Sequence, residues 1–156
     1  MSSPEARLEE LGIVLPGVPV PAGSYVPATR HGDLVFLSGH GPIKLDGSGL
    51  VQGKVGGDVT LDEAREAARL TGLQLLASLR AELGSLDRVA SVLKLLGMVN
   101  CAPGFSQTPA VIDGCSHLLL EVFGPEVGRH ARSAVGMAEL PFDIAVEIEA
   151  VVAVAP

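Results

Sequence analysis

The residues best suited to chemistry lie in the last third of the chain, where one arginine precedes two glutamates. Arg132 stands in the segment Gly128-Arg-His-Ala-Arg-Ser133, at the start of a predicted strand of small and apolar residues. A guanidinium group there can bind a carboxylate or phosphate through two parallel hydrogen bonds, or form a surface ion pair. Glu147 and Glu149 share one face of a second predicted strand. Either carboxylate can orient a water molecule, pair with Arg132 or remain solvated.

A second group of polar residues lies near the start of the chain. Tyr25 is the only tyrosine, and the segment Ser38-Gly-His-Gly-Pro42 follows a short apolar run. Glycines in such a segment permit close backbone approach and leave amides accessible to a ligand. The four histidines show no metal-ligand spacing, and Cys101 and Cys115 do not form a Cys-x-x-Cys pair, so we expect no metal and free thiols.

Helices and strands that position these residues are indicated by periodicity and turn residues. Residues 4–11 predict a short helix, and residues 12–23 form an irregular, proline-rich arm. The capping-box pattern Thr60-Leu-Asp-Glu63 begins a helix that ends at Gly84, and Thr108-Pro109 begins another that ends at Gly124. Strands are expected at residues 25–29, 34–38, 89–99, 133–138 and 146–154, with Arg30-His-Gly-Asp33 as a hairpin turn and 39–57 as a long surface excursion.

This order predicts an α+β fold of two layers, a mixed sheet with two helices on one face. We expect residues 1–24 to form a helix and arm and residues 25–156 to form one domain. One side of strand 146–154 is entirely apolar, and the other carries Val151 and Ala153 beside Glu147 and Glu149, so both sides are substantially apolar. The sheet face left without helices is therefore expected to pack against another copy of the chain.

Composition and charge narrow the function classes. With a net charge of −7, the chain is a poor match for nucleic-acid phosphates, which are bound by clustered Lys and Arg. The longest apolar stretches are shorter than the roughly 20 residues that a membrane helix needs. The acidic N-terminus does not resemble a secretory signal, so a cytoplasmic location is expected.

Several segments together resemble the reactive-intermediate deaminase (Rid, or YjgF-type) family, also labelled endoribonuclease L-PSP. The resemblance spans Tyr25 to Val154 and is carried by Tyr25, Phe36-Leu-Ser-Gly39, Ala131-Arg-Ser133, Leu140-Pro141 and Val146-Glu-Ile-Glu-Ala150. It implies a fold like chorismate mutase and a homotrimer with sites between subunits. It also implies hydrolysis of 2-imino or 2-enamino acids, such as 2-aminoacrylate, to 2-keto acids and ammonia, without a cofactor.

The same resemblance assigns roles to individual residues. Arg132 would hold the substrate carboxylate and Glu147 would place the attacking water, while Tyr25, Ser38 and Gly39 would line the pocket. Three further pocket positions depart from the family pattern: His40 stands where Gln is frequent, Asp113 where Asn is usual, and Ala134 where Cys is frequent. The longer arm and a Gly124-Pro-Glu-Val-Gly128 loop also indicate a divergent branch.

Two other functions stay open at the level of sequence. RNA cleavage is suggested by the second family label, but the acidic charge and the few aromatic residues oppose it. A non-catalytic trimer that binds or senses a small carboxylate metabolite is favoured by the extra negative charge of Asp113.

Overall fold

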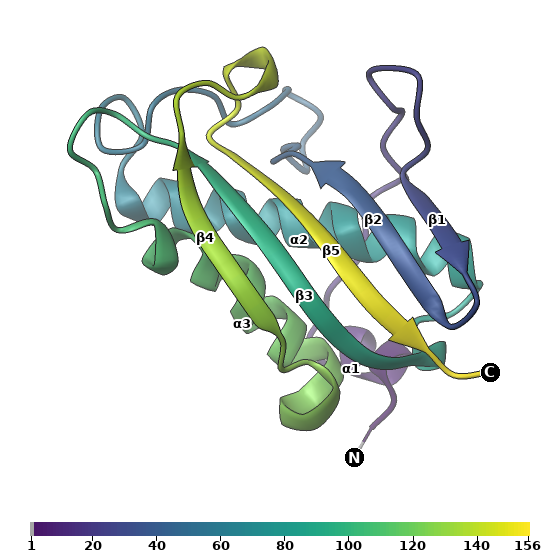
Figure 1. Cartoon of the computed structure of the whole chain (residues 1–156). Helices are drawn as coiled ribbons and strands as arrows, with labels where there is room; N and C mark the ends of the chain where they lie inside the picture. Colours follow the sequence, from purple (N-terminus) through teal and green to yellow (C-terminus); the bar gives the residue numbers. More distant parts are fainter. Residues whose placement is uncertain (1) are drawn as a thin grey trace.

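One mixed sheet is the framework of the fold. The computed structural model describes residues 2–156, and their strands are β1 (Ala28–His31), β2 (Leu34–His40), β3 (Val89–Asn100), β4 (Ala131–Met137) and β5 (Val146–Val154). The strand order across the sheet is β1-β2-β5-β3-β4. Neighbouring strands are antiparallel except β3 and β4, which run parallel and are connected through a helix (Figure 1).

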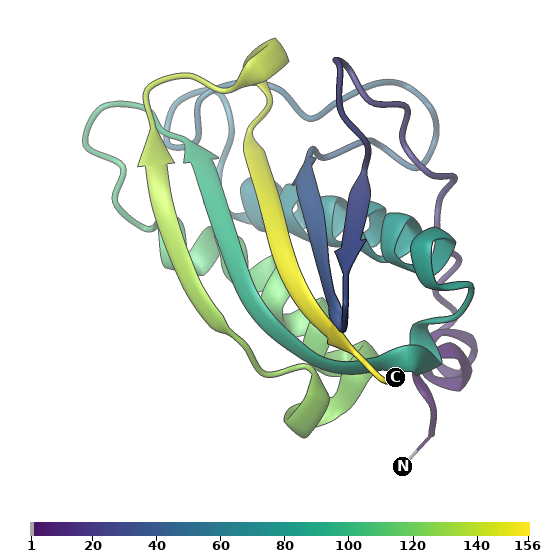
Figure 2. The same ribbon diagram turned by 45° about the vertical axis from the view of Figure 1, so that its right-hand side comes forward.

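Two long helices, α2 (Leu61–Leu83) and α3 (Thr108–Val127), cover one face of the sheet (Figures 1 and 2). The predicted capping box begins α2: the Thr60 hydroxyl accepts from Glu63 N at 3.2 Å, and Thr60 N donates to the Glu63 carboxylate at 2.8 Å. Gly84 ends α2 in the left-handed conformation, with φ of 82°. The predicted two-layer α+β class is confirmed.

The main core lies between these helices and the sheet. The inward side chains of β5 are Val146, Ile148, Ala150, Val152 and Val154, and all are buried, as their alternation predicts. Leucines of α2, including Leu75, Leu76 and Leu79, pack in the same cluster. Complete burial of one such side chain stabilises the fold by about 1.5–3 kcal/mol, so this alternation fixes which face of β5 meets the helices.

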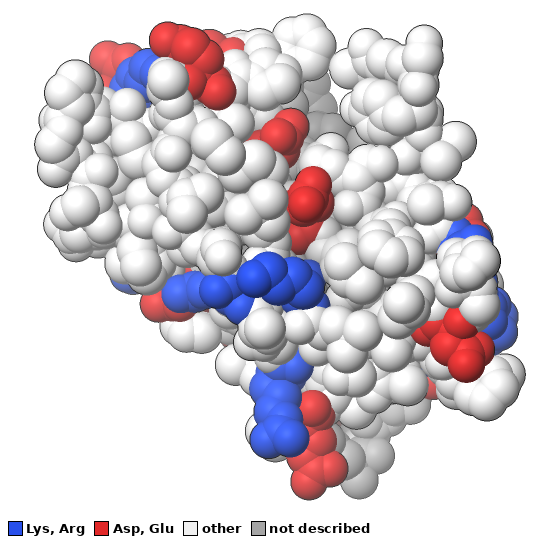
Figure 3. All heavy atoms as spheres, in the orientation of Figure 1, with Lys and Arg blue, Asp and Glu red and all other residues white. Residues whose placement is uncertain are grey.

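The opposite face of the sheet has no helix over it. Phe36 on β2 and Val135 on β4 remain 45% and 39% exposed. This face is mostly uncharged, with a few acidic and basic side chains near its middle (Figure 3). At one end, Met98, Leu140 and Ile144 form a second, smaller apolar cluster with Leu50, Leu96 and Met137 against it.

The N-terminal helix α1 (Pro4–Glu10) packs on the domain. Ser3 caps it by accepting from Ala6 N, and Leu8 enters the main core. The Glu5 carboxylate accepts two hydrogen bonds from Arg80 of α2, at 2.7 and 3.1 Å. These contacts fix the start of the arm that later reaches the pocket. Within residues 2–156, no helix is long and apolar enough to cross a membrane.

Three expected boundaries around β1 and β4 were wrong. Tyr25 lies in a bend before β1, because Pro27 lacks the amide hydrogen that a paired strand uses and β1 begins only after it. The turn after β1 is Gly32-Asp33 alone, because Arg30 and His31 still pair with β2. β4 begins at Ala131, two residues earlier than expected, because Ala131 and Arg132 pair with β3.

The ends of α3 also differ from the prediction. Thr108 does not cap the helix, because its hydroxyl donates to Ala134 O at 2.9 Å, and Gln107 takes the cap position. The helical segment runs on to Val127 across a break at Gly124, whose φ is 77°. The excursion from Gly39 to Gly57 is partly built into the fold, since Val55 is fully buried and pairs with Cys101.

Candidate functional site

A pocket of about 730 Å³ opens at the end of β2, beside the start of β5. Residues from six parts of the chain meet there: the arm, the end of β2, the excursion after it, helix α2, the turn before β5, and the start of β5. The lining includes Pro19, Val20, Pro21, Ala22, Tyr25, Ser38, Gly39, His40, Gln74, Pro141, Phe142, Ile144, Glu147 and Glu149. The site therefore depends on the packing of distant segments.

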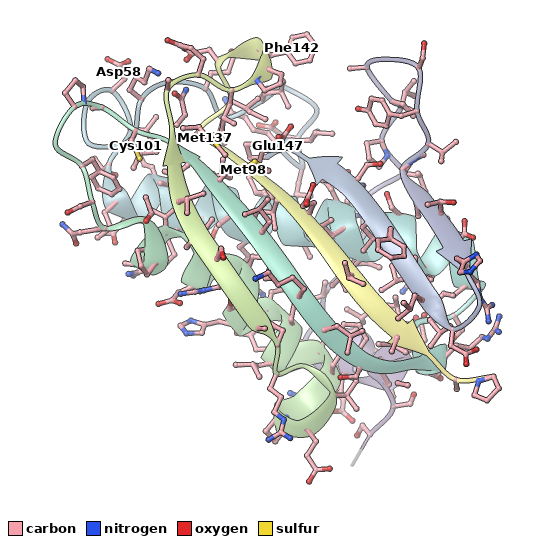
Figure 4. All side chains as sticks on the ribbon, viewed as in Figure 1. Asp58, Met98, Cys101, Met137, Phe142 and Glu147 are labelled. Atoms are coloured by element: carbon pink, nitrogen blue, oxygen red, sulfur yellow. The ribbon has the colours of Figure 1, made fainter. Side chains whose placement is uncertain are left out.

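Glu147 is the carboxylate most closely built into this pocket. Its side chain lies against the backbone of Gly39, where an added Cβ atom would be only 2.9 Å from Glu147 Cδ. Burial and the neighbouring Glu149 carboxylate raise the pKa of Glu147 above its ordinary value. Figure 4 places Glu147 on the free face of the sheet, below the turn that carries Phe142 and near Met98 and Met137. A half-buried carboxylate of this kind can take and return a proton.

An irregularity in β2 positions Gly39 and His40. Between the pairs Leu37–Ala150 and His40–Ile148, β2 contains one residue more than β5, which is a β-bulge. The extra residue reverses the alternation, so His40 points toward α2 and is only 5% exposed. Bulges of this type re-aim side chains beside binding sites. The glycine predicted to allow close approach does so here, toward the Glu147 side chain.

The His40 ring has both nitrogens engaged. Nδ1 lies 2.5 Å from the Ser38 carbonyl oxygen, and Nε2 lies 2.8 Å from the Ser78 hydroxyl. A carbonyl oxygen only accepts, so Nδ1 carries the hydrogen and Nε2 accepts from Ser78. Burial lowers the pKa of His40. His40 thus joins β2 to α2 as a neutral ring.

Tyr25 and Ser38 lie at the pocket, as predicted. The Tyr25 hydroxyl accepts a hydrogen bond from Ala22 N at 3.3 Å, and the ring is about half exposed. The Ser38 hydroxyl donates to Val26 O at 2.6 Å. The first contact folds the segment before β1 on itself, and the second ties that segment to β2, so together they shape one wall of the pocket.

Two pocket residues were missed by sequence reasoning. Gln74 lies on α2 among leucines, and only its polarity within that apolar run could have indicated a special position. Phe142 lies at the rim in the turn Pro141–Asp143, where Phe142 and Asp143 have φ of 57° and 56°. Gln52 donates to Phe142 O at 2.7 Å, and Asn100 donates to the Asp143 carboxylate at 2.9 Å, which holds this left-handed pair.

Arg132, Asp113 and Ala134 lie together elsewhere, and none of them lines this pocket. Arg132 Nη1 donates to Asp113 Oδ1 at 2.7 Å and to the Ser116 hydroxyl at 3.1 Å, while Nη2 donates to Pro109 O at 3.3 Å. Within residues 2–156, no hydrogen-bond partner is seen for Arg132 Nε. Ala134, two residues on, packs against the main core.

Neither metal ligands nor reactive thiols mark the site. Residues 2–156 contain no group of three or more His, Cys, Asp or Glu side chains arranged to hold a metal ion. Cys101 and Cys115 are free thiols. Burial raises the pKa of Cys115 to about 12, and burial also raises that of Cys101, so both favour the unreactive thiol form.

In chemical terms, each chain carries a pocket with one proton-accepting carboxylate and, at a separate place, one partly accessible guanidinium group. The first can activate water, and the second can bind an anion.

Comparison with known proteins shows that this fold and sequence recur. A family model described as "YjgF/chorismate mutase-like, putative endoribonuclease" matches residues 5–148. Protein TCP17 of Trypanosoma cruzi is 46% identical over 147 residues, covering 94% of this chain and 91% of that protein.

Two solved structures cover nearly the whole chain. A protein of unknown function from Agrobacterium tumefaciens is 43% identical with a TM-score of 0.87, covering 98% of this chain and 94% of that one. A "putative endoribonuclease" from Shewanella oneidensis is 34% identical with a TM-score of 0.92, covering 98% and 100%. The resemblance inferred from the Ala-Arg-Ser, Leu-Pro and Val-Glu-Ile-Glu-Ala segments is confirmed, and the chain belongs to the YjgF/chorismate mutase-like family.

Proposed function

We propose that this protein hydrolyses reactive 2-imino and 2-enamino acids to 2-keto acids and ammonia, in sites completed between the subunits of a homotrimer. The observation that carries the proposal is the Glu147 carboxylate. It is half-buried in a pocket against Gly39, and burial raises its pKa. A carboxylate with a raised pKa is a better proton acceptor near neutral pH than an exposed one.

The reaction needs only water and proton transfers. An enamine such as 2-aminoacrylate first takes a proton from solvent at C3 and becomes the iminium ion. Water then attacks C2 while Glu147 accepts one of its protons, and the C=N double bond becomes a single bond. The proton passes to nitrogen, the C2 hydroxyl loses its own proton, and the C–N bond breaks to release ammonia and the keto acid. Backbone amides near Gly39 support the developing charge.

Arg132 enters this scheme from a neighbouring copy of the chain. Its Nε–H and one Nη2–H are the two donors that a carboxylate binds side by side, and Nε has no partner within residues 2–156. The uncovered sheet face, with Phe36 and Val135 exposed, supplies an apolar surface for association. Figure 3 shows the basic side chains beside the acidic ones near the middle of this face.

The test compares the wild type with three variants, using ammonia release from freshly generated 2-aminoacrylate. Each hydrogen bond to a charged group is worth about 1.5–3 kcal/mol, so Arg132→Ala should lower kcat/KM by about 100-fold or more. Glu147→Gln should lower kcat. Arg129→Ala is the matched control, because Arg129 is exposed and does not line the pocket. Full activity in Arg132→Ala, or a monomer in sedimentation, rejects the proposal.

A non-catalytic, metabolite-binding trimer is the second candidate, and the Arg132–Asp113 ion pair favours it. With one carboxylate already 2.7 Å from the guanidinium, an incoming carboxylate has to compete for it. Tight binding of 2-ketobutyrate with no turnover of any imine would support this candidate over the enzyme.

RNA cleavage is the third possibility, suggested by the descriptions of the family and of the Shewanella oneidensis relative. The net charge of −7 opposes it. On the face in Figure 3, Lys and Arg occupy only small areas. A nuclease assay with wild type and Arg132→Ala, purified in parallel, separates this activity from deamination.

A further inference from the structure

Gln74 is a buried polar side chain that nothing in the fold explains. It lies on α2 with 2% of its surface exposed, and it lines the pocket that contains Glu147. Its amide oxygen Oε1 is buried and has no hydrogen-bond partner within residues 2–156. An unsatisfied buried acceptor costs about 1–3 kcal/mol, so leucine or methionine would stabilise the fold better at this position.

The neighbouring polar residues of α2 differ from Gln74 because each has a partner. Thr71, almost one turn earlier, donates from its hydroxyl to Ala67 O at 2.8 Å. Ser78, one turn later, is bonded to His40. Positions three and four apart on a helix share a face, so these residues form one polar stripe beneath the sheet. Only Gln74 opens on the pocket.

None of the other polar side chains that line the pocket donates to Gln74 Oε1. The His40 ring is held between Ser38 and Ser78, and the Ser38 hydroxyl is committed to Val26 O. Glu147 and Glu149 are acceptors when ionised. Within residues 2–156, Gln74 Oε1 is therefore an acceptor left without a donor. A ligand that fits it presents an N–H or O–H group.

We propose that Gln74 determines specificity by accepting a hydrogen bond from the donor group at C2 of the ligand. If the proposed function holds, on which this identification of the group rests, the donor is the imine or enamine N–H. The product then carries a C2 carbonyl in its place, which offers Gln74 Oε1 no hydrogen. The contact therefore favours the substrate over the keto-acid product and assists product release.

The test measures binding alone, so that it does not depend on turnover. Calorimetry compares 2-hydroxybutyrate with 2-oxobutyrate, which have the same charge and differ in the donor at C2. The proteins are the wild type, Gln74→Met, which keeps the side-chain length, and Thr71→Val. Thr71→Val is the matched control because it removes a buried hydroxyl from the same helix outside the pocket. Thermal unfolding of all three confirms that they are folded.

The wild type and Thr71→Val should bind 2-hydroxybutyrate more tightly than 2-oxobutyrate. Gln74→Met should weaken the binding of 2-hydroxybutyrate by about 3- to 10-fold and leave the affinity for 2-oxobutyrate within about twofold of the wild-type value. The inference is overturned if Gln74→Met weakens the binding of both ligands equally or changes the binding of neither. It is also overturned if the wild type binds neither acid. So does a crystal of the 2-hydroxybutyrate complex in which Gln74 Oε1 contacts only water. If this preference is found but no imine is hydrolysed, the role of Gln74 stands and the deaminase proposal fails.

Discussion

Substitution of Gly39 by alanine tests whether catalysis depends on the position of the Glu147 carboxylate. The new Cβ would lie 2.9 Å from Glu147 Cδ and 3.2 Å from Cγ and Oε1, whereas ordinary contact begins at 3.4 Å. Glu147 must therefore move by about 0.5 Å or more at Cδ. Misplacement of a catalytic group by about 1 Å can cost about 100-fold in rate. We expect kcat of Gly39→Ala to fall by about 10- to 100-fold, which corresponds to about 1.4–2.7 kcal/mol.

The stability of Gly39→Ala should change little. The atoms in the way belong to the end of a flexible side chain, and Gly39 does not have a positive φ that alanine would avoid. We expect the free energy of unfolding in urea to stay within about 1 kcal/mol of the wild type. Gly17→Ala is the matched control, because nothing lies within 4 Å of a Cβ atom there.

The assay is single-turnover release of ammonia from 2-aminoacrylate, and a double-mutant cycle with Glu147→Gln identifies the cause. If the methyl group acts by displacing the carboxylate, Gly39→Ala adds little once Glu147 has been replaced. If the methyl group blocks the ligand instead, the two losses are additive. Unchanged kcat in Gly39→Ala, or additive losses, would refute the reasoning that the carboxylate is held in place by Gly39.

Three further predictions concern charge. Glu149→Gln removes a carboxylate that raises the pKa of Glu147, so the acid limb of kcat/KM in a pH–rate profile should lie at lower pH than in the wild type. Asp113→Asn frees Arg132, so calorimetry should show tighter binding of 2-oxobutyrate, while the unfolding free energy falls by less than about 1 kcal/mol because the pair is partly exposed. Burial lowers the pKa of His40, so below about pH 6.5 the unfolded chain binds the proton more readily and the free energy of unfolding decreases as the pH falls. In urea unfolding between about pH 5.5 and 7, His40→Gln should show a smaller dependence of this free energy on pH than the wild type. An unchanged dependence would contradict the prediction.

Sequence alone determined the layers of this protein, because they follow from local chemistry. The Thr60–Glu63 capping box and Gly84 define α2, and the unbroken apolar side of the segment from Val146 to Val154 defines the buried face of β5. The motif around Arg132 and Glu147 was sufficient to identify the family. Tyr25 was misassigned because β1 begins only after Pro27, and Thr108 because its hydroxyl donates to Ala134 O, which is distant in the sequence.

Tertiary structure alone decided how the candidate site is assembled. A single extra residue in β2 turned His40 from the free face of the sheet toward α2. No local sequence pattern predicts such a bulge. Gln74 reached the pocket only because α2 crosses the sheet at the end of β2, and its missing partner is a property of the packed neighbours. The separation of Arg132 from Glu147 within one chain has the same origin. The two residues lie on different strands and on opposite faces of the sheet. Strand order and side-chain direction are set by long-range pairing, which spacing along the sequence does not encode.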